Sequence, residues 1–119
     1  MINGDKDAGF SIFWPDDGLD TGPILLQKSC KVKPNDTLDS IYGRFMYPEG
    51  IIGMAEAVNK VADGTAPKIV QPEEGASYEP SLKKGDIQFI NWNDSALNIH
   101  NFIRGKDCRK DAMIVVMTS

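Results

Sequence analysis

Three carboxylates lie close together in one stretch of the 119-residue chain, because Asp16, Asp17 and Asp20 fall within five residues. Like charges at this spacing repel, so the pKa of at least one carboxyl group should rise if the stretch is partly buried. A carboxylate with a raised pKa can take up and return a proton near neutral pH. Gly18 and Gly22 allow tight turns and close approach to a ligand, and as hinges they favour a mobile lid. The stretch is therefore a candidate acid–base site.

Plainer interpretations of the same stretch remain open. Asp and Gly are ordinary turn residues, so a solvated loop is the main alternative. A calcium loop of the EF-hand type does not fit, because the position eleven after Asp16 holds Gln27 rather than Glu. No other metal site is indicated, since His100 is the only histidine and no Cys-x-x-Cys spacing occurs. Cys30 and Cys108 are too few for a disulfide framework and favour free thiols in a reducing compartment.

Two predicted strands hold the acidic stretch between them. Residues 10–14 and 24–32 are rich in β-branched and aromatic side chains, which favour strands. The nine residues 15–23 connect them, whereas tight hairpin loops have about two to five residues. A two-stranded sheet buries little surface and is marginally stable alone. We therefore expect the chain to be part of a larger fold.

Two apolar series at helical spacing follow the strands. Asn35 or Asp36 should cap the first helix, and Pro48 should break or kink it. The first series, expected to pack in a core, is Leu38, Ile41, Tyr42, Phe45 and Met46. The second is Ile51, Met54, Ala55, Val58, Val61 and Ala62. Gly64 is a typical residue after a helix end.

The last third of the chain changes character. Residues 67–80 carry three prolines and few apolar side chains, which is typical of a linker. Residues 87–90 could form a short strand. Asp94 or Ser95 should cap a short helix that ends near Gly105.

Composition narrows the function. Thirteen basic and seventeen acidic residues give a net charge of −4, with a pI of about 4.9. No basic surface for nucleic acid is expected at that balance. The apolar runs are far shorter than the ~20 residues of a membrane span, and the first residues lack the apolar core of a signal peptide.

At the acidic loop the chain resembles a known family. Residues 9–23 resemble the folate-binding loop of formyltransferase-fold enzymes, and 17–22 contain the motif core that glycinamide ribonucleotide and methionyl-tRNA formyltransferases share. The preceding sequence Phe-Ser-Ile-Phe-Trp is restricted to fewer members of this family, and so are residues 44–51 and 71–79. Together they are similar to the N-terminal hydrolase domain of the 10-formyltetrahydrofolate dehydrogenases. The resemblance extends over residues 2–105.

The resemblance implies an α/β fold and a division of the chain. Residues 1–66 would be the end of a Rossmann-like formyltransferase catalytic domain, and 67–80 a linker. Residues 81–119 would be the start of the small C-terminal β-barrel domain, with a tail after Gly105 that departs from the family pattern.

The resemblance also assigns site residues and an activity. Asp20 would be the catalytic carboxylate, and the main chain of Asp17, Gly18 and Leu19 would line the pterin pocket; no metal is implied. The family removes the formyl group of 10-formyltetrahydrofolate, giving tetrahydrofolate and, by an NADP-dependent step, carbon dioxide. NADP and phosphopantetheine belong to further domains. The catalytic His and Asn of the family lie on an earlier segment, and His100 does not match that His.

We therefore expect this chain, taken alone, to be an inactive fragment. The alternatives are a non-catalytic interaction or pseudo-enzyme fragment, and a piece of a methionyl-tRNA formyltransferase. The Phe-Ser-Ile-Phe-Trp strand argues against the tRNA enzyme, because it is restricted to fewer members of the family. The acidic pI argues against it as well, because tRNA binding favours basic surfaces. The resemblance implies a cytoplasmic protein, with a mitochondrial one as the alternative. It also implies folate as the ligand, neither nucleic acid nor membrane as a partner, and a homo-oligomeric parent.

Overall fold

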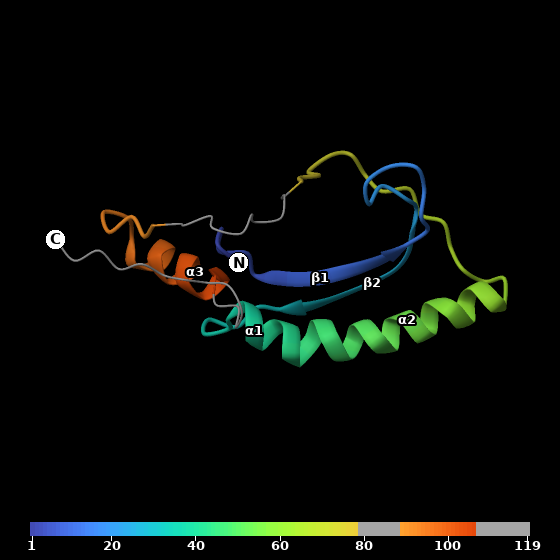
Figure 1. The fold of residues 1–119 in the computed structure, drawn as a ribbon, viewed down its shortest axis with the longest axis horizontal. Coiled ribbons are helices and arrows are strands. Elements are labelled where there is room, and N and C mark those ends of the chain that lie inside the picture. Colours follow the sequence, from blue (N-terminus) through green and yellow to red (C-terminus); the bar gives the residue numbers. More distant parts are fainter. Residues whose placement is uncertain (79–88, 107–119) are drawn as a thin grey trace. The chain divides into compact units, whose positions relative to one another are not determined.

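The computed structural model describes residues 1–78 and 89–106 (Figure 1). The chain divides into two units. The hairpin unit comprises residues 7–31 and 42–77. The terminal unit comprises residues 1–6, 32–41 and 78–119, as far as they are described. Of the predicted elements, the off-pattern tail and the first half of the strand at 87–90 lie outside the described residues. Its second half, 89–90, is not in a strand.

Both predicted strands are present in the hairpin unit. β1 (Asp7–Phe13) pairs with β2 (Ile24–Lys31) in an antiparallel ladder, with Phe10 opposite Lys28 and Ile12 opposite Leu26. The register shifts between Ile12 and Phe13, directly before the acidic loop. Irregularities of this kind bend and twist a strand, so they change the direction in which the chain enters the loop.

The helical region confirms two predicted helices and corrects their junction. α1 (Leu38–Ile41) is followed by the π-helical turn η1 (Tyr42–Met46) and by α2 (Tyr47–Ala62). Pro48 does not interrupt the helical path, because it lies in the first turn of α2, where a missing N–H costs little. The α-helical pattern instead gives way to a π-helical one just before it. Gly64 follows the end of α2 with a φ of +70°, as predicted.

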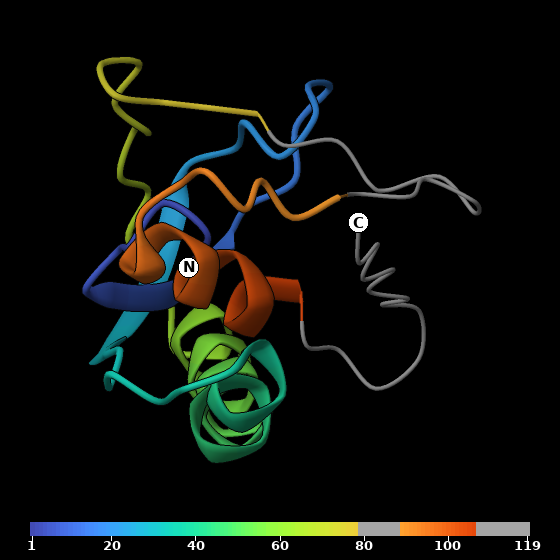
Figure 2. The same cartoon turned by 90° about the vertical axis from the view of Figure 1, so that its left-hand side faces the viewer.

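Helix α2 runs alongside the hairpin, and Figure 2 views it end on, with both strands on one side. The helix meets the strands through small residues: a side chain at Gly53 would lie 3.3 Å from the ring of Phe10, and Ala57 is only 3% exposed. Ile24 and Leu25 are the buried residues of β2. The core of the unit is therefore thin.

The apolar series of the sequence are buried only in part, since Ile41 of the first series is 3% exposed. Tyr42 of the first series is 58% exposed, while Phe45 and Met46 are half-buried. In α2 the large apolar side chains are exposed, namely Ile51, Ile52, Met54, Val58 and Val61. A two-stranded sheet is too narrow to cover a whole apolar helix face, so only the strip of small residues is buried.

A charged contact joins β2 to α2. Lys28 Nζ lies 3.2 Å from a carboxylate oxygen of Glu49 and 3.2 Å from one of Glu56. The hydrogen bond to Glu49 is the main reason that the pKa of Lys28 is raised above its ordinary value. Desolvation, the next largest effect, lowers this pKa, and the contact with Glu56 raises it.

The terminal unit contains α1 and α3 (Ala96–Lys106). Ser95 caps α3 as predicted, since its Oγ accepts the N–H of Asn98 at 3.1 Å. The predicted end is wrong: Gly105 lies inside the helix, where a side chain would meet Ile2 at 2.6 Å. The predicted cap of α1 is also wrong, because Thr37 rather than Asp36 accepts the N–H of Ser40.

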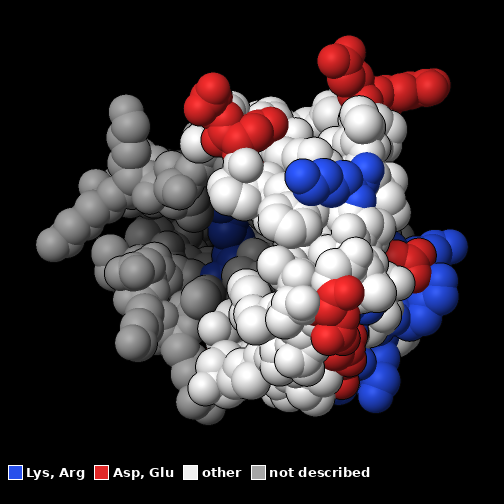
Figure 3. Space-filling view, turned by 90° about the vertical axis from the view of Figure 1, so that its right-hand side faces the viewer, with Lys and Arg blue, Asp and Glu red and all other residues white. Residues whose placement is uncertain are grey.

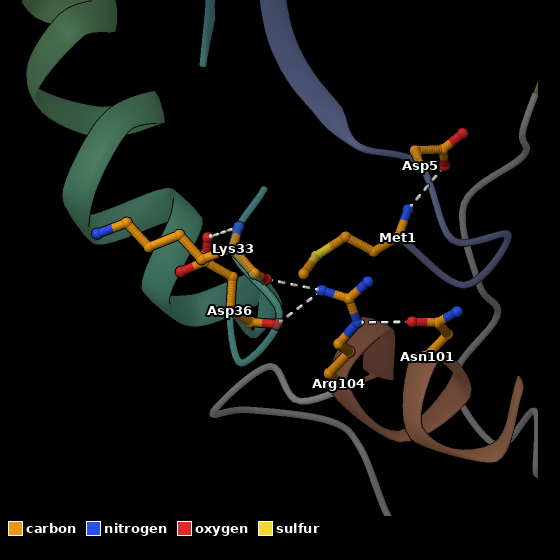
Figure 4. A network of polar contacts seen from close by, with 6 residues as sticks. All are labelled: Met1, Asp5, Lys33, Asp36, Asn101 and Arg104. Carbon is orange, nitrogen blue, oxygen red and sulfur yellow. Dashed lines mark hydrogen bonds and ion pairs between the residues drawn. The ribbon is translucent and has the colours of Figure 1, made fainter. Parts of the chain in front are cut away.

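Asp36 has a different role in this unit, in a polar network around Arg104 (Figure 4). Arg104 is buried, and its guanidinium donates to Asn101 Oδ1 at 2.9 Å and to the carbonyl oxygens of Lys33 and Asp36 at 3.2 and 3.5 Å. The Asp36 carboxylate accepts the N–H of Lys33 at 2.7 Å. The network fixes the turn before α1 against α3, so it explains the burial of three polar residues.

Candidate functional site

A backbone hydrogen bond joins the two ends of the acidic loop where it leaves the hairpin. The N–H of Trp14 donates to the carbonyl oxygen of Pro23 at 2.9 Å. Residues 15–21 are all exposed, so the partial burial considered for this stretch from the sequence is not found in the described structure. Figure 3 faces the end of the hairpin unit that carries this loop, and acidic side chains project from the edge of that face.

The two glycines of the loop are required by close packing. A side chain at Gly22 would lie 1.5 Å from the carbonyl oxygen of Trp14, and one at Gly18 would lie 1.9 Å from Thr21 Oγ1. Gly22 is buried. These contacts brace the loop at the positions where the sequence indicated hinges.

Asp16 connects the first part of the loop to Thr21. Its Oδ1 accepts the N–H of Gly18 at 2.9 Å and the hydroxyl of Thr21 at 2.8 Å. A side chain that bonds the backbone two residues further on is a common turn device of aspartate. Of the three carboxylates, Asp16 therefore has a structural role within the loop.

Asp20 occupies the second half of the loop in an unusual conformation. Its φ is +56°, and it is the only described residue other than glycine with a positive φ. Such a conformation costs an L-residue about 1–2 kcal/mol, although aspartate tolerates it better than most. Strained positions persist only where surrounding contacts determine them. Asp17 and Asp20 both lie in the exposed part of the loop.

A later segment of the same unit supplies those contacts. Gln71 Nε2 donates to the carbonyl oxygen of Asp20 at 2.9 Å and to that of Gly22 at 2.6 Å. Ile69 forms an isolated antiparallel bridge with Ile24, through hydrogen bonds of 2.6 and 2.9 Å. The segment predicted as a linker is thus attached to the hairpin at residues 67–71.

Trp14 adds two further contacts between the loop base and this segment. Its indole Nε1 donates to the carbonyl oxygen of Pro67 at 2.9 Å, and the ammonium of Lys68 lies 4.9 Å from the centre of its ring. Trp14 also lines an apolar groove between the strands and α2, together with Phe13 and Val58.

The sequence pattern indicated the loop but not the role of Gln71. That residue stands out in the sequence only as part of a restricted motif, and the prolines around it favour a linker. Asp17, Gly18, Leu19 and Asp20 do occur together in one exposed loop, as the sequence predicted. His100 lies in the terminal unit, where its Nε2 is 2.9 Å from the carbonyl oxygen of Pro34.

Metal-binding and membrane-spanning features are both absent from residues 1–78 and 89–106, the described part of the chain. No group of three or more His, Cys, Asp or Glu side chains there could hold a metal ion. Within the same residues, no helix is both long and apolar enough to cross a membrane.

The fold is similar to that of known proteins. Residues 1–58 match the formyl transferase family model. The fold is that of solved formyltransferases, including an N-formyltransferase from Helicobacter canadensis (TM-score 0.69, 24% identity, 87% of this chain and 38% of that one). HypX from Aquifex aeolicus is similar as well (TM-score 0.73, 17% identity, 97% and 21%). The matching region and the mixed helices and strands fit an α/β formyltransferase domain.

Curated relatives with higher sequence identity indicate which formyltransferase-like proteins the chain resembles. The chain is 63% identical over 107 residues to the mitochondrial 10-formyltetrahydrofolate dehydrogenase of Homo sapiens, covering 90% of this chain. It is 55% identical over 116 residues to the cytosolic enzyme of Xenopus laevis, covering 98%. These matches identify the chain as a fragment similar to the 10-formyltetrahydrofolate dehydrogenases. It spans only 12–13% of the length of these relatives, which include mitochondrial and cytosolic proteins.

Proposed function

We propose that this chain supplies the carboxylate side of a site that removes the formyl group from 10-formyltetrahydrofolate, with Asp20 as the catalytic carboxylate. The observation that carries the proposal is the exposed, braced loop that presents Asp20 in a left-handed conformation. The names of the relatives support the substrate. A similar solved structure, a sugar formyltransferase in the presence of 5-N-formyl-THF, supports it as well, although its identity of 24% makes this a likeness of fold.

The proposed chemistry is hydrolysis of the formyl amide. Water adds to the formyl carbon, the bond from that carbon to N10 breaks, and formate and tetrahydrofolate leave. Asp20 takes the proton of the attacking water and returns one to the departing nitrogen. The main chain of Asp17, Gly18 and Leu19 lines the pterin pocket. A His and an Asn of another segment stabilise the charge that develops on the formyl oxygen.

In the longer proteins the proposed fate of the formyl group is oxidation. It would pass through a phosphopantetheine carrier to an NADP-dependent dehydrogenase and leave as carbon dioxide. We assign no residue of this chain to either group. The proposed ligand of this chain is therefore folate. Assembly into homo-oligomers, and location in the cytoplasm or the mitochondrion, are proposed for the longer protein.

The proposed domain division is a catalytic part (1–66), a linker (67–80) and the start of a small C-terminal domain (81–119). The contacts of Pro67, Ile69 and Gln71 favour counting residues 67–71 with the catalytic part. By itself the 119-residue polypeptide would not turn over substrate, because His100, its one histidine, does not match the catalytic His of the family that the chain resembles.

A chimera tests the proposal. In it, the 107-residue matching segment of the human mitochondrial relative is replaced by its counterpart from this chain. We expect the chimera to release formate from 10-formyltetrahydrofolate, while the isolated chain releases none. A folded chimera without formate release would contradict the proposal and favour a non-catalytic fragment. Turnover by the isolated chain would contradict the predicted inactivity.

A further inference from the structure

The side-chain amide of Gln71 makes a two-pronged contact with the acidic loop. Its Nε2 carries two hydrogens and lies 2.9 Å from the Asp20 carbonyl oxygen and 2.6 Å from that of Gly22. Both partners are acceptors, so the opposite orientation of the amide would place oxygen against oxygen. The orientation of the amide, and with it both hydrogen bonds, is therefore determined.

These two bonds lie on either side of the position that most needs support. Asp20 has a φ of +56°, and the carbonyl groups held by Gln71 are its own and that of the residue two further on. Asp16 braces the loop through the N–H of Gly18 and the hydroxyl of Thr21, but it contacts neither of these two carbonyl groups. Without Gln71, no hydrogen bond described for the loop would engage the carbonyl oxygens of Asp20 and Gly22.

The brace is itself anchored. Two residues before Gln71, Ile69 pairs with Ile24 of β2 through two backbone hydrogen bonds. Further back, the Pro67 carbonyl oxygen accepts the indole N–H of Trp14. The amide of Gln71 is thus attached to the same strands from which the loop emerges, and this attachment can transmit a fixed geometry to Asp20.

We infer that Gln71 is a positioning residue for Asp20: it holds the backbone that presents the catalytic carboxylate, without touching substrate. The inference rests on the proposed function of Asp20. Misplacing a reacting group by about 1 Å can cost on the order of 10²-fold in rate. Loss of the brace should therefore lower kcat, while KM should change little, because the Asp17–Leu19 main chain keeps its own support through Asp16.

The test uses the chimera and a matched pair of glutamine variants. Gln71→Met removes both N–H donors of the side chain and keeps a similar side-chain volume. Gln71→Glu also removes both donors, and its side chain is closer in shape to glutamine. Gln27→Met is the control, because Gln27 Nε2 donates to Ser11 Oγ at 2.8 Å on the strands, away from the loop. We expect about a 10- to 100-fold loss of kcat in both Gln71 variants. We expect wild-type rates in Gln27→Met, and faster amide exchange at residues 20–22 only when Gln71 is changed.

A double-mutant cycle with Asp20→Asn distinguishes the possible failures. Residues that act as one unit are non-additive, so Gln71→Met should cause no further loss in the Asp20→Asn background. An equal loss in both backgrounds would mean that Gln71 acts independently of Asp20 and would overturn the inference. Full activity in Gln71→Met, or global unfolding of both Gln71 variants, would overturn it too. Full activity in Asp20→Asn alone would instead overturn the proposed function.

Discussion

The indole Nε1 of Trp14 donates a hydrogen bond to the carbonyl oxygen of Pro67 at 2.9 Å, and so connects the base of the acidic loop to a segment 53 residues later. Trp14→Phe removes this donor and keeps an aromatic ring. The usual net cost of such a loss is about 0.5–1.5 kcal/mol in the free energy of unfolding. Urea unfolding of the chimera measures it, and exchange of the Ile69 amide should quicken.

Trp92→Phe is the matched control, because Trp92 is 57% exposed and lies in the terminal unit. It should change neither quantity. Equal effects of the two substitutions would show that the bond to Pro67 does not hold the segment.

Gly22→Ala should be among the most damaging small substitutions. The added Cβ would lie 1.5 Å from the carbonyl oxygen of Trp14, and a backbone atom cannot move aside as a flexible side chain can. We expect a loss of about 2–3 kcal/mol in unfolding free energy, in the upper range for point substitutions. Gly50→Ala in α2, with no heavy atom within 4 Å of the new Cβ, should instead stabilise by about 0.5–1 kcal/mol. Thermal unfolding of both variants checks the contrast, and similar destabilisation by both would contradict it.

Asp16 and Asp20 should differ in which substitution they tolerate. Asp16→Asn keeps the Oδ1 that accepts from Gly18 and Thr21, so formate release by the chimera should fall only slightly. Asp16→Ala loses both bonds and should loosen the loop, with a larger fall in rate. If Asp16→Asn were more damaging than Asp20→Asn, the choice of catalytic carboxylate would be wrong.

The contact of Lys28 with Glu49 and Glu56 should give a stability change at high pH. The pKa of Lys28 is raised above its ordinary value of 10.5, mainly by the hydrogen bond to Glu49. The stabilisation is therefore present below pH 10.5 and is lost as the pH rises through the higher folded value. Urea unfolding of Lys28→Met should lack this loss. Lys31→Met, which removes an exposed ion pair with Asp7, is the control.

The sequence predicted both strands of the hairpin and the position of the loop between them. Strand-forming residues on both sides of a run of Asp, Gly and Pro define the hairpin and its loop, because these preferences act between near neighbours. Gln71 could not be found in this way, since its contacts with Asp20 and Gly22 join positions 51 and 49 residues apart. The prolines near it favour irregular backbone, but they do not indicate that the segment binds a strand.

Helical spacing also predicted α2 without predicting which of its faces is covered. The spacing selects Ile51, Met54 and Val58, whereas Gly53 and Ala57 are the buried positions. Periodicity reports where apolar side chains lie around a helix, and the partner determines which of them are buried. The cap of α1 shows the same limit on a smaller scale, because Asp36 and Thr37 are both suitable caps and the turn at Lys33 engages the carboxylate of Asp36.

The central claim is that Asp20 performs the proton transfer, and single-turnover formate release by the Asp20→Asn chimera tests it most directly. Asparagine keeps the volume and removes the proton acceptor, so the rate should fall by about 10²–10⁴-fold with folate affinity nearly unchanged. Asp63→Asn, an exposed carboxylate at the end of α2, is the control and should keep the full rate. An Asp20→Asn chimera that is folded, binds the substrate and releases formate at the unsubstituted rate would contradict the account.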